Sequence, residues 1–356
     1  MGWFKKILII ILLGFVILAG FLLYAGKFKE TGRKFLYQDS DANRYFNGNL
    51  FNYCGINKFK EQIIKIEPRK NSPSHEANII MKGDSFFYTG LDSEPLPEYF
   101  EKITGQKVFY QAKLGYEITP LKYLERIGYQ KGESKIFIYE TIEQASIKRA
   151  QELESDLSGK NDNSATPDQI IDLGYNLGYF LFDSIDIEYF IRNNFIFKPL
   201  DLWFKNKAFI WLGDINSETP IYSDEPRMLF SESEISFNNR QNRFDSINQM
   251  ADNISQETKL IKDKYNLTLI YLIIPNKFSI YGERAASGQE YDNFIPKLQE
   301  ALKNKNIKYV DIYGVFNRYR QQHPDKLLYY VGDSHYTPLG KELLTNALAE
   351  TIADLK

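Results

Sequence analysis

Two short runs, far apart in the sequence, carry the side chains of a serine acyl-transfer site. The first is Gly-Asp-Ser at 83–85, which follows an apolar strand-like segment and presents a serine hydroxyl at a turn into a helix. The second is Asp-Ser-His-Tyr at 333–336, just before the last helical pattern. A free serine hydroxyl is a poor nucleophile, so Ser85 needs a base. His335 can take its proton while Asp333 accepts the other ring N–H, and the chain offers only three histidines for the role.

Each run also has an ordinary structural interpretation. Gly-Asp-Ser is common in turns and helix caps, and Asp333 with Ser334 can simply cap the last helix. A lone histidine is more often a surface or core residue than a base. Because the two runs occur together, in this order, at opposite ends of an α/β pattern, we favour the catalytic interpretation.

The segments between the two runs alternate short apolar stretches with helical patterns. Continuous apolarity is typical of parallel strands buried on both faces. The alternation predicts an α/β fold, a three-layer αβα sandwich with a mainly parallel sheet of the flavodoxin type. In such sheets the working site lies at the carboxyl ends of the strands, where Ser85 falls. The predicted strands are 77–81, 108–114, 135–139, 268–274 and 309–312.

Three helices are predicted from apolar residues that recur on one face. Pro338 stands near the start of the last one, where a missing N–H costs least. The residues expected to face the core are Ile247, Met250, Ala251, Ile254 and Ile261 in the first, Ile295, Leu298 and Leu302 in the second, and Leu343, Leu344, Ala347, Leu348 and Ile352 in the third.

The N-terminus carries a membrane signal. Residues 7–25 form an uncharged apolar run that would span ~28 Å as a helix, about the thickness of a bilayer core. The run is long for a signal-peptide core, and no clear cleavage site follows it. We therefore expect residues 1–34 to be a membrane anchor with its flanks and the body to lie outside the cytoplasm. A cleaved signal peptide is the alternative.

The rest of the chain divides into two further parts. Residues 35–76 are polar and weakly periodic, which is typical of a juxtamembrane lead-in, and residues 77–356 form the predicted catalytic domain. Within that domain, residues 155–245 interrupt the strand–helix alternation with a polar loop, aromatic-rich helical stretches and a possible strand at 207–212. We interpret them as an insertion that can cap the site.

Composition excludes several classes of function. The net charge is −2, so nothing suggests nucleic-acid binding. A single cysteine, Cys54, rules out an internal disulfide framework. Histidines and carboxylates are not spaced as metal ligands, and we expect neither a metal nor a cofactor.

The two runs resemble motifs of SGNH hydrolase-like proteins, above all the membrane-anchored branch related to alginate O-acetyltransferase proteins. Gly-Asp-Ser at 83–85 is similar to the first SGNH block, whose serine is the nucleophile. Asp-Ser-His-Tyr at 333–336 resembles the Asp-x-His-Trp motif of that branch, with Tyr336 in place of tryptophan. Pro-Asn-Lys, ending at Lys277, resembles a Pro-x-Lys segment of the same group. The resemblance implies that Ser85 is the nucleophile, and Tyr336 and Lys277 are candidates to lie beside the substrate. Lys277 can assist there electrostatically, but a solvated lysine at a strand end is the alternative that we slightly favour.

The sequence departs from this family where the oxyanion is bound. SGNH proteins place a glycine in the second block and an asparagine in the third. Gly115 can stand for the glycine, but Glu140 occupies the asparagine position after the strand at 135–139. A carboxylate would repel an oxyanion, so Glu140 must point elsewhere or hold another group in place. The backbone N–H groups of Ser85 and Gly115 are then the expected donors.

The resemblance implies an extracytoplasmic, membrane-bound serine O-acyltransferase. It would move an acetyl group onto a cell-surface or exported polysaccharide through an acyl ester of Ser85, with a multi-spanning membrane acyltransferase as the donor. An esterase with the same triad is one alternative, since only water exclusion and acceptor recognition separate transfer from hydrolysis. A catalytically degenerate glycan-binding or assembly protein is the other.

Overall fold

The chain is described from a computed structural model. Its described residues are 61–66, 77–111, 119–131, 135–157, 228–239, 244–285 and 290–355, with isolated positions at 50, 200, 203, 204, 207 and 211. Contacts divide the chain into two compact units. One is Lys58–Asp162 with Ser217–Lys356, and the other is Met1–Asn57 with Asn163–Asn216. Nearly all described residues belong to the first of these, which we call the sheet unit.

The predicted anchor at 7–25 lies outside the described residues. Within the part of the chain that is described, no helix is long and apolar enough to cross a membrane.

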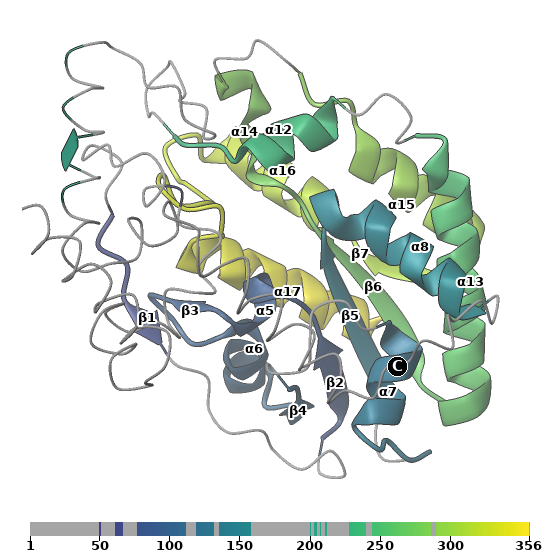
Figure 1. Cartoon of the computed structure of the whole chain (residues 1–356). Helices are drawn as coiled ribbons and strands as arrows, with labels where there is room; N and C mark the ends of the chain where they lie inside the picture. Colours follow the sequence, from purple (N-terminus) through teal and green to yellow (C-terminus); the bar gives the residue numbers. More distant parts are fainter. Residues whose placement is uncertain are drawn as a thin grey trace, which may run out of the picture. The chain divides into compact units, whose positions relative to one another are not determined.

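The sheet unit is built on one five-stranded sheet (Figure 1). Its order is β4-β2-β5-β6-β7, and every neighbouring pair is parallel. The prediction of an α/β fold with a mainly parallel sheet is therefore confirmed. The strands are β2 (Ile79–Lys82), β4 (Val108–Phe109), β5 (Ile136–Ile142), β6 (Thr268–Ile274) and β7 (Lys308–Val310).

The strands match the apolar runs closely. β6 coincides with the run at 268–274, and β2 and β5 overlap theirs. β7 ends before the predicted limit at 312 because Asp311 begins a helix, its side chain accepting a hydrogen bond from the Gly314 N–H at 2.9 Å. The predicted strand at 108–114 is a strand only at Val108 and Phe109; it is wrong at Tyr110 and Gln111, and residues 112–118 lie outside the described part.

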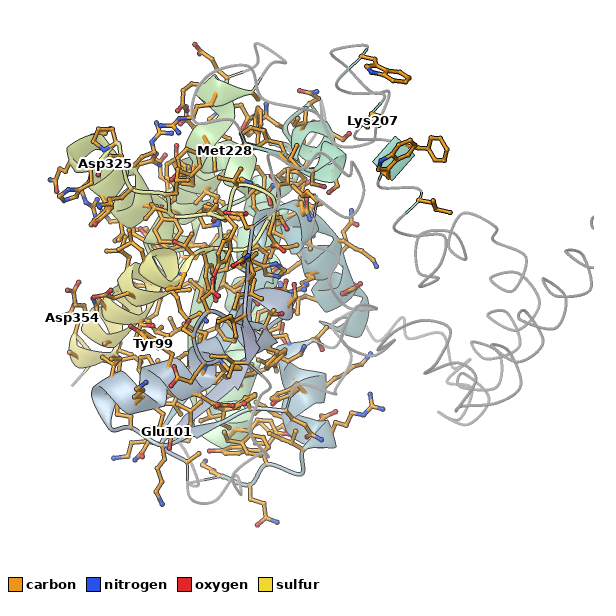
Figure 2. All side chains as sticks on the ribbon, turned by 90° about the vertical axis from the view of Figure 1, so that its left-hand side faces the viewer. Tyr99, Glu101, Lys207, Met228, Asp325 and Asp354 are labelled. Atoms are coloured by element: carbon orange, nitrogen blue, oxygen red, sulfur yellow. The ribbon has the colours of Figure 1, made fainter. Side chains whose placement is uncertain are left out.

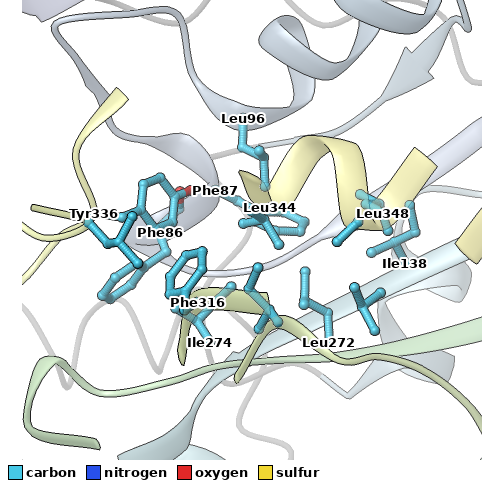
Figure 3. Close-up of a cluster of buried hydrophobic side chains, with 14 of the residues drawn as sticks. Phe86, Phe87, Leu96, Ile138, Leu272, Ile274, Phe316, Tyr336, Leu344 and Leu348 are labelled. Carbon is cyan, nitrogen blue, oxygen red and sulfur yellow. The ribbon is translucent and has the colours of Figure 1, made fainter. Parts of the chain in front are cut away.

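Helices cover both faces of the sheet and create two hydrophobic cores. Alternate residues of β6 separate them: Ile270, Leu272 and Ile274 face one core and Leu269 and Tyr271 the other. Figure 3 shows part of the first core, and Figure 2 shows the side chains that fill the unit. The first core contains residues of α5 (Ser85–Tyr88), α6 (Leu96–Thr104), α14 (Lys277–Tyr281), α16 (Ile312–Gln322) and α17 (Pro338–Ala353). The second contains residues of α7 (Pro120–Arg126), α8 (Ser146–Leu157), α13 (Ser246–Tyr265) and α15 (Phe294–Asn304).

The predicted helix faces are correct. Every residue assigned to the core in α13, α15 and α17 is buried except Leu343, which is half-buried. Pro338 is the first residue of α17, and the Thr337 side chain caps it by accepting from the Gly340 N–H. The 3.6-residue period was thus sufficient to orient these three helices on the sheet.

Some residues assigned to the lead-in and the insertion belong to the sheet unit. β1 (Lys65–Ile66) pairs with β3 (Gly90–Leu91) in a small antiparallel sheet. Met228, Leu229 and Phe230 are buried ahead of α12 (Glu232–Asn238). The possible strand at 207–212 is wrong at its described positions, where Lys207 and Trp211 are helical.

Candidate active site

The turn after β2 presents the candidate nucleophile. Ser85 is the first residue of α5 and is half-buried, so its hydroxyl can be reached. The Asp84 side chain caps the helix by accepting from the Phe86 N–H at 3.0 Å. Gly83 is required by packing, since a Cβ there would lie 2.3 Å from Glu140 Oε2 and 2.7 Å from the Phe87 ring. The short turn can therefore pass over Glu140 and expose Ser85.

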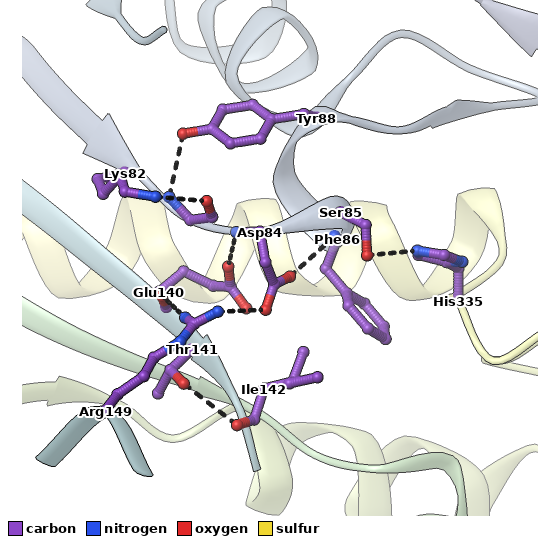
Figure 4. Close-up of polar contacts among 11 residues, drawn as sticks. Lys82, Asp84, Ser85, Phe86, Tyr88, Glu140, Thr141, Ile142, Arg149 and His335 are labelled. Carbon is purple, nitrogen blue, oxygen red and sulfur yellow. Dashed lines mark hydrogen bonds and ion pairs between the residues drawn. The ribbon is translucent and has the colours of Figure 1, made fainter. Parts of the chain in front are cut away.

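The segment before α17 brings the other two side chains to this turn. His335 Nε2 lies 3.0 Å from Ser85 Oγ, and His335 Nδ1 lies 2.7 Å from Asp333 Oδ1. A carboxylate only accepts, so Nδ1 carries a hydrogen and the Nε2 of the neutral ring is left to accept the Ser85 hydroxyl. The three residues singled out in the sequence thus form one hydrogen-bond chain at the carboxyl edge of the sheet; Figure 4 shows its Ser85–His335 link.

The imidazole is held from several directions. Asp333 Oδ1 also accepts from the His335 N–H at 2.8 Å, and the Tyr330 N–H donates to the His335 carbonyl at 3.1 Å. The Phe86 ring packs on the His335 ring with 4.6 Å between centroids. Asp333 and His335 are both buried. The ring therefore has a fixed tautomer and a fixed direction toward Ser85, which is what a general base needs.

A buried charge cluster supports the nucleophile turn from below (Figure 4). The Arg149 guanidinium, on α8, lies 3.1 Å from Asp84 Oδ2 and donates to the Glu140 carbonyl at 2.9 Å. The Glu140 carboxyl accepts from the Asp84 N–H at 2.7 Å. Burial raises the pKa of Glu140 well above its ordinary value, and burial lowers that of Lys82 to about 8. Glu140 therefore holds the turn in place, one of the two possibilities left open by the sequence.

The oxyanion donors are only partly described. The Ser85 N–H has no hydrogen-bond acceptor among the residues that the structure describes. Its neighbours are engaged, because the Phe86 N–H donates to Asp84 and the Gly83 N–H donates to the Tyr88 hydroxyl at 3.1 Å. Gly115, the other predicted donor, lies outside the described residues.

Tyr336 and Lys277, predicted to lie beside the substrate, are turned into the protein. The Tyr336 side chain is 3% exposed, and its hydroxyl donates to the Phe86 carbonyl. Lys277 is fully buried, and its Nζ donates to backbone carbonyls of the segment before His335. The prediction that these two side chains lie beside the substrate is therefore wrong, because neither the Tyr336 hydroxyl nor the Lys277 ammonium is open to a ligand. Both side chains instead tie together the segments that carry Ser85 and His335.

Two buried carboxylates at this edge of the sheet accept from backbone N–H groups of the segment that follows β6. Glu143 accepts from the Asn276 N–H at 3.0 Å and from the Tyr291 hydroxyl at 2.8 Å. Glu234 accepts from the Phe278 N–H at 3.2 Å. Within the described ranges, no group of three or more His, Cys, Asp or Glu side chains is placed to hold a metal ion.

The C-terminal part of the chain is similar to a known family. Residues 224–356 match the family model described as SGNH hydrolase-like domain, acetyltransferase AlgX. The match contains Lys277, Asp333 and His335 and confirms the resemblance to this branch of SGNH proteins; Ser85 lies outside it. It indicates an acetyltransferase- or esterase-like domain. Comparisons with curated proteins and with solved structures find no match.

Proposed function

We propose that the protein is a serine-dependent O-acyltransferase that carries an acetyl group as an ester of Ser85. The observation that carries the proposal is the chain of hydrogen bonds from Ser85 Oγ through His335 to Asp333. The family match at 224–356 supports acetyl as the group transferred.

The geometry supports a two-step reaction. His335 Nε2 takes the hydroxyl proton as Ser85 Oγ attacks the acyl carbon of the donor, and the leaving group departs with that proton. His335 then removes a proton from the acceptor hydroxyl, which attacks the acyl ester and releases Ser85 Oγ to regain a proton. Asp333 stabilises the imidazolium in both steps, and the Ser85 N–H donates to the oxyanion. Proton transfer by the base contributes about 10²–10⁴-fold.

We further propose a polysaccharide acceptor at the cell envelope. The apolar run at 7–25 would anchor the chain there, facing a donor that is itself a multi-spanning membrane acyltransferase. Anchoring supports transfer rather than hydrolysis, because a tether raises the effective concentration of a membrane-bound donor. The second candidate function is ester hydrolysis, favoured by the half-buried position of Ser85, which leaves a path for water.

One assay separates these functions. The full chain in detergent is given an activated acetyl ester, with and without an oligosaccharide acceptor, and both free acetate and acetylated sugar are measured. A transferase forms acetylated sugar at the expense of acetate, whereas an esterase releases acetate at the same rate in both cases. Ser85→Ala and His335→Ala should each abolish turnover, and the double variant should be scarcely worse. His323→Ala, at the exposed end of α16, is the matched control. A Ser85→Ala chain with full turnover contradicts the proposal.

A further inference from the structure

The turn at 331–333, which Ser334 separates from His335, has backbone groups that charged side chains bind. Lys277 Nζ donates to the carbonyls of Val331 and Asp333 at 2.9 and 3.1 Å. The Glu61 carboxylate accepts from the N–H groups of Val331 and Gly332 at 3.0 and 2.6 Å. The Lys277 ammonium thus binds two carbonyl groups of the turn, and the Glu61 carboxylate binds two of its backbone N–H groups.

Lys277 occupies an environment that disfavours its charge. Its side chain is fully buried, with Nζ 5.8 Å from the centroid of the Phe230 ring, and burial lowers its pKa below the ordinary value. Three carboxylates act against this effect by attracting the charge: Glu234, Glu61 and Asp333. Burying a charge costs folding free energy, and a protein with a hydrophobic residue of similar volume at such a position is often equally stable. Packing alone therefore does not account for a lysine at this position.

The contacts of Asp333 show what the lysine does. The Asp333 carbonyl accepts from Lys277, and the Asp333 carboxylate accepts from the backbone N–H and the ring Nδ1–H of His335. Lys277 thus fixes the backbone of Asp333, and the Asp333 side chain in turn fixes His335. Rotation of the 331–333 turn would move the Asp333 carboxylate and, with it, the His335 ring away from Ser85.

We propose that Lys277 is a positioning residue of the acyl-transfer site, which with Glu61 holds the 331–333 turn so that His335 stays aligned with Ser85. The inference rests on the proposed function of Ser85 and His335. Displacement of a catalytic group by about 1 Å can cost on the order of 10²-fold in rate. Within the described residues the hydrogen bonds of Lys277 go to the turn and not to Ser85, so we expect its effect to pass through the turn.

The chain contains a matched control for this proposal. Lys341 is also buried and donates to backbone and hydroxyl oxygens, at 2.7 Å to the Glu94 carbonyl and 2.8 Å to Ser93 Oγ. Lys341→Met therefore removes an equivalent buried ammonium that does not bind the 331–333 turn. Lys277→Met removes the charge and keeps the length of the side chain, and Lys277→Arg restores the charge.

The first test is kinetic, with the full chain in detergent and a small activated acetyl ester as substrate. Lys277→Met should lower kcat about 10- to 100-fold with KM changed less than about 3-fold, because alignment and not binding is lost. Lys277→Arg should recover part of kcat, and Lys341→Met should retain it within about 3-fold. Glu61→Gln keeps Lys277 in place and should lower kcat less than Lys277→Met does. This variant tests the proposal if Lys277→Met does not fold. A folded Lys277→Met chain with unchanged kcat overturns the inference.

The second test does not depend on turnover. With three histidines in the chain, ¹⁵N labelling of histidine and NMR can follow the His335 Nδ1–H that bonds to Asp333. Its signal should shift or broaden in Lys277→Met and Glu61→Gln and persist in Lys341→Met. An unchanged signal in both turn variants overturns the positioning role even if catalysis by Ser85 holds. An active Ser85→Ala chain overturns the proposed function and leaves the NMR result to decide the positioning role.

Discussion

Replacing Arg149 with methionine removes the cation that supports the nucleophile turn. Asp84 is 5% exposed, and in Arg149→Met its carboxylate would lose the guanidinium 3.1 Å away. The Glu140 carbonyl would also lose a donor at 2.9 Å. Methionine keeps most of the apolar stem, so the main loss is the pairing of a buried charge. Breaking a buried pair on one side costs about 3–5 kcal/mol, and we expect a loss of that size in the free energy of unfolding.

A double variant tests whether the stranded carboxylate is the cause. Asp84→Asn removes the charge that Arg149→Met leaves unpaired, and the amide can still accept from the Phe86 N–H. The double variant should therefore be more stable than Arg149→Met alone, with a coupling free energy of about 2 kcal/mol. The kcat of Arg149→Met should fall as well, because Asp84 caps the helix that begins with Ser85.

Urea unfolding of the four chains measures these free energies. The control is Lys148→Met, the adjacent residue on α8, whose side chain is 65% exposed in a loose ion pair with Glu152. It should change the free energy of unfolding by less than about 0.5 kcal/mol. The reasoning is refuted if Arg149→Met matches the wild type within about 1 kcal/mol, or if Asp84→Asn adds its own loss with no coupling.

Three further predictions concern the surrounding groups. Burial raises the pKa of Glu140 well above 4.5, so the wild type should lose free energy of unfolding as pH rises above that value. Between about pH 5 and about pH 8, Glu140→Gln should lose less of this free energy in urea unfolding than the wild type does. An equal loss would contradict the prediction. Burial lowers the pKa of Lys341 from 10.5 to about 8, so its contribution to the free energy of unfolding should rise with pH across that range, by up to ~1.4 kcal/mol per pH unit. Lys341→Met should lack this increase when both chains are unfolded at about pH 8 and about pH 9.5. Tyr336→Phe leaves the Phe86 carbonyl without its hydroxyl donor and should lose about 1–2 kcal/mol by thermal unfolding, with a lower kcat and a similar KM; an unchanged kcat would show that the bond does not align the site.

The sequence predicted the parts of the site that depend on local patterns. Continuous apolar runs marked β2, β5 and β6, and a strand-to-helix turn after β2 placed Ser85 at the correct edge of the sheet. Asp333 and His335 are two residues apart, so their pairing needed no knowledge of the tertiary fold.

The supporting residues could not be predicted because their partners are distant in the chain. Glu61 is 271 residues from Gly332, whose N–H it accepts, and it comes from a segment with weak periodicity. Arg149 lies on a helix where an arginine is expected to face solvent, and only the fold reveals Asp84 beside it. Lys277 was a candidate to lie beside the substrate, yet it is fully buried and its Nζ donates to the segment before His335. The role of Glu140 likewise required the turn above it to be seen.

Reaction with a serine-directed fluorophosphonate tests most directly whether His335 activates Ser85. The full chain is treated with the reagent, digested, and the modified peptide is identified and timed by mass spectrometry. We expect one phosphonyl group on Ser85, a rate that falls about 10²–10⁴-fold in His335→Ala, and an unchanged rate in His323→Ala. No modification of Ser85, or modification at the same rate without His335, would contradict the account.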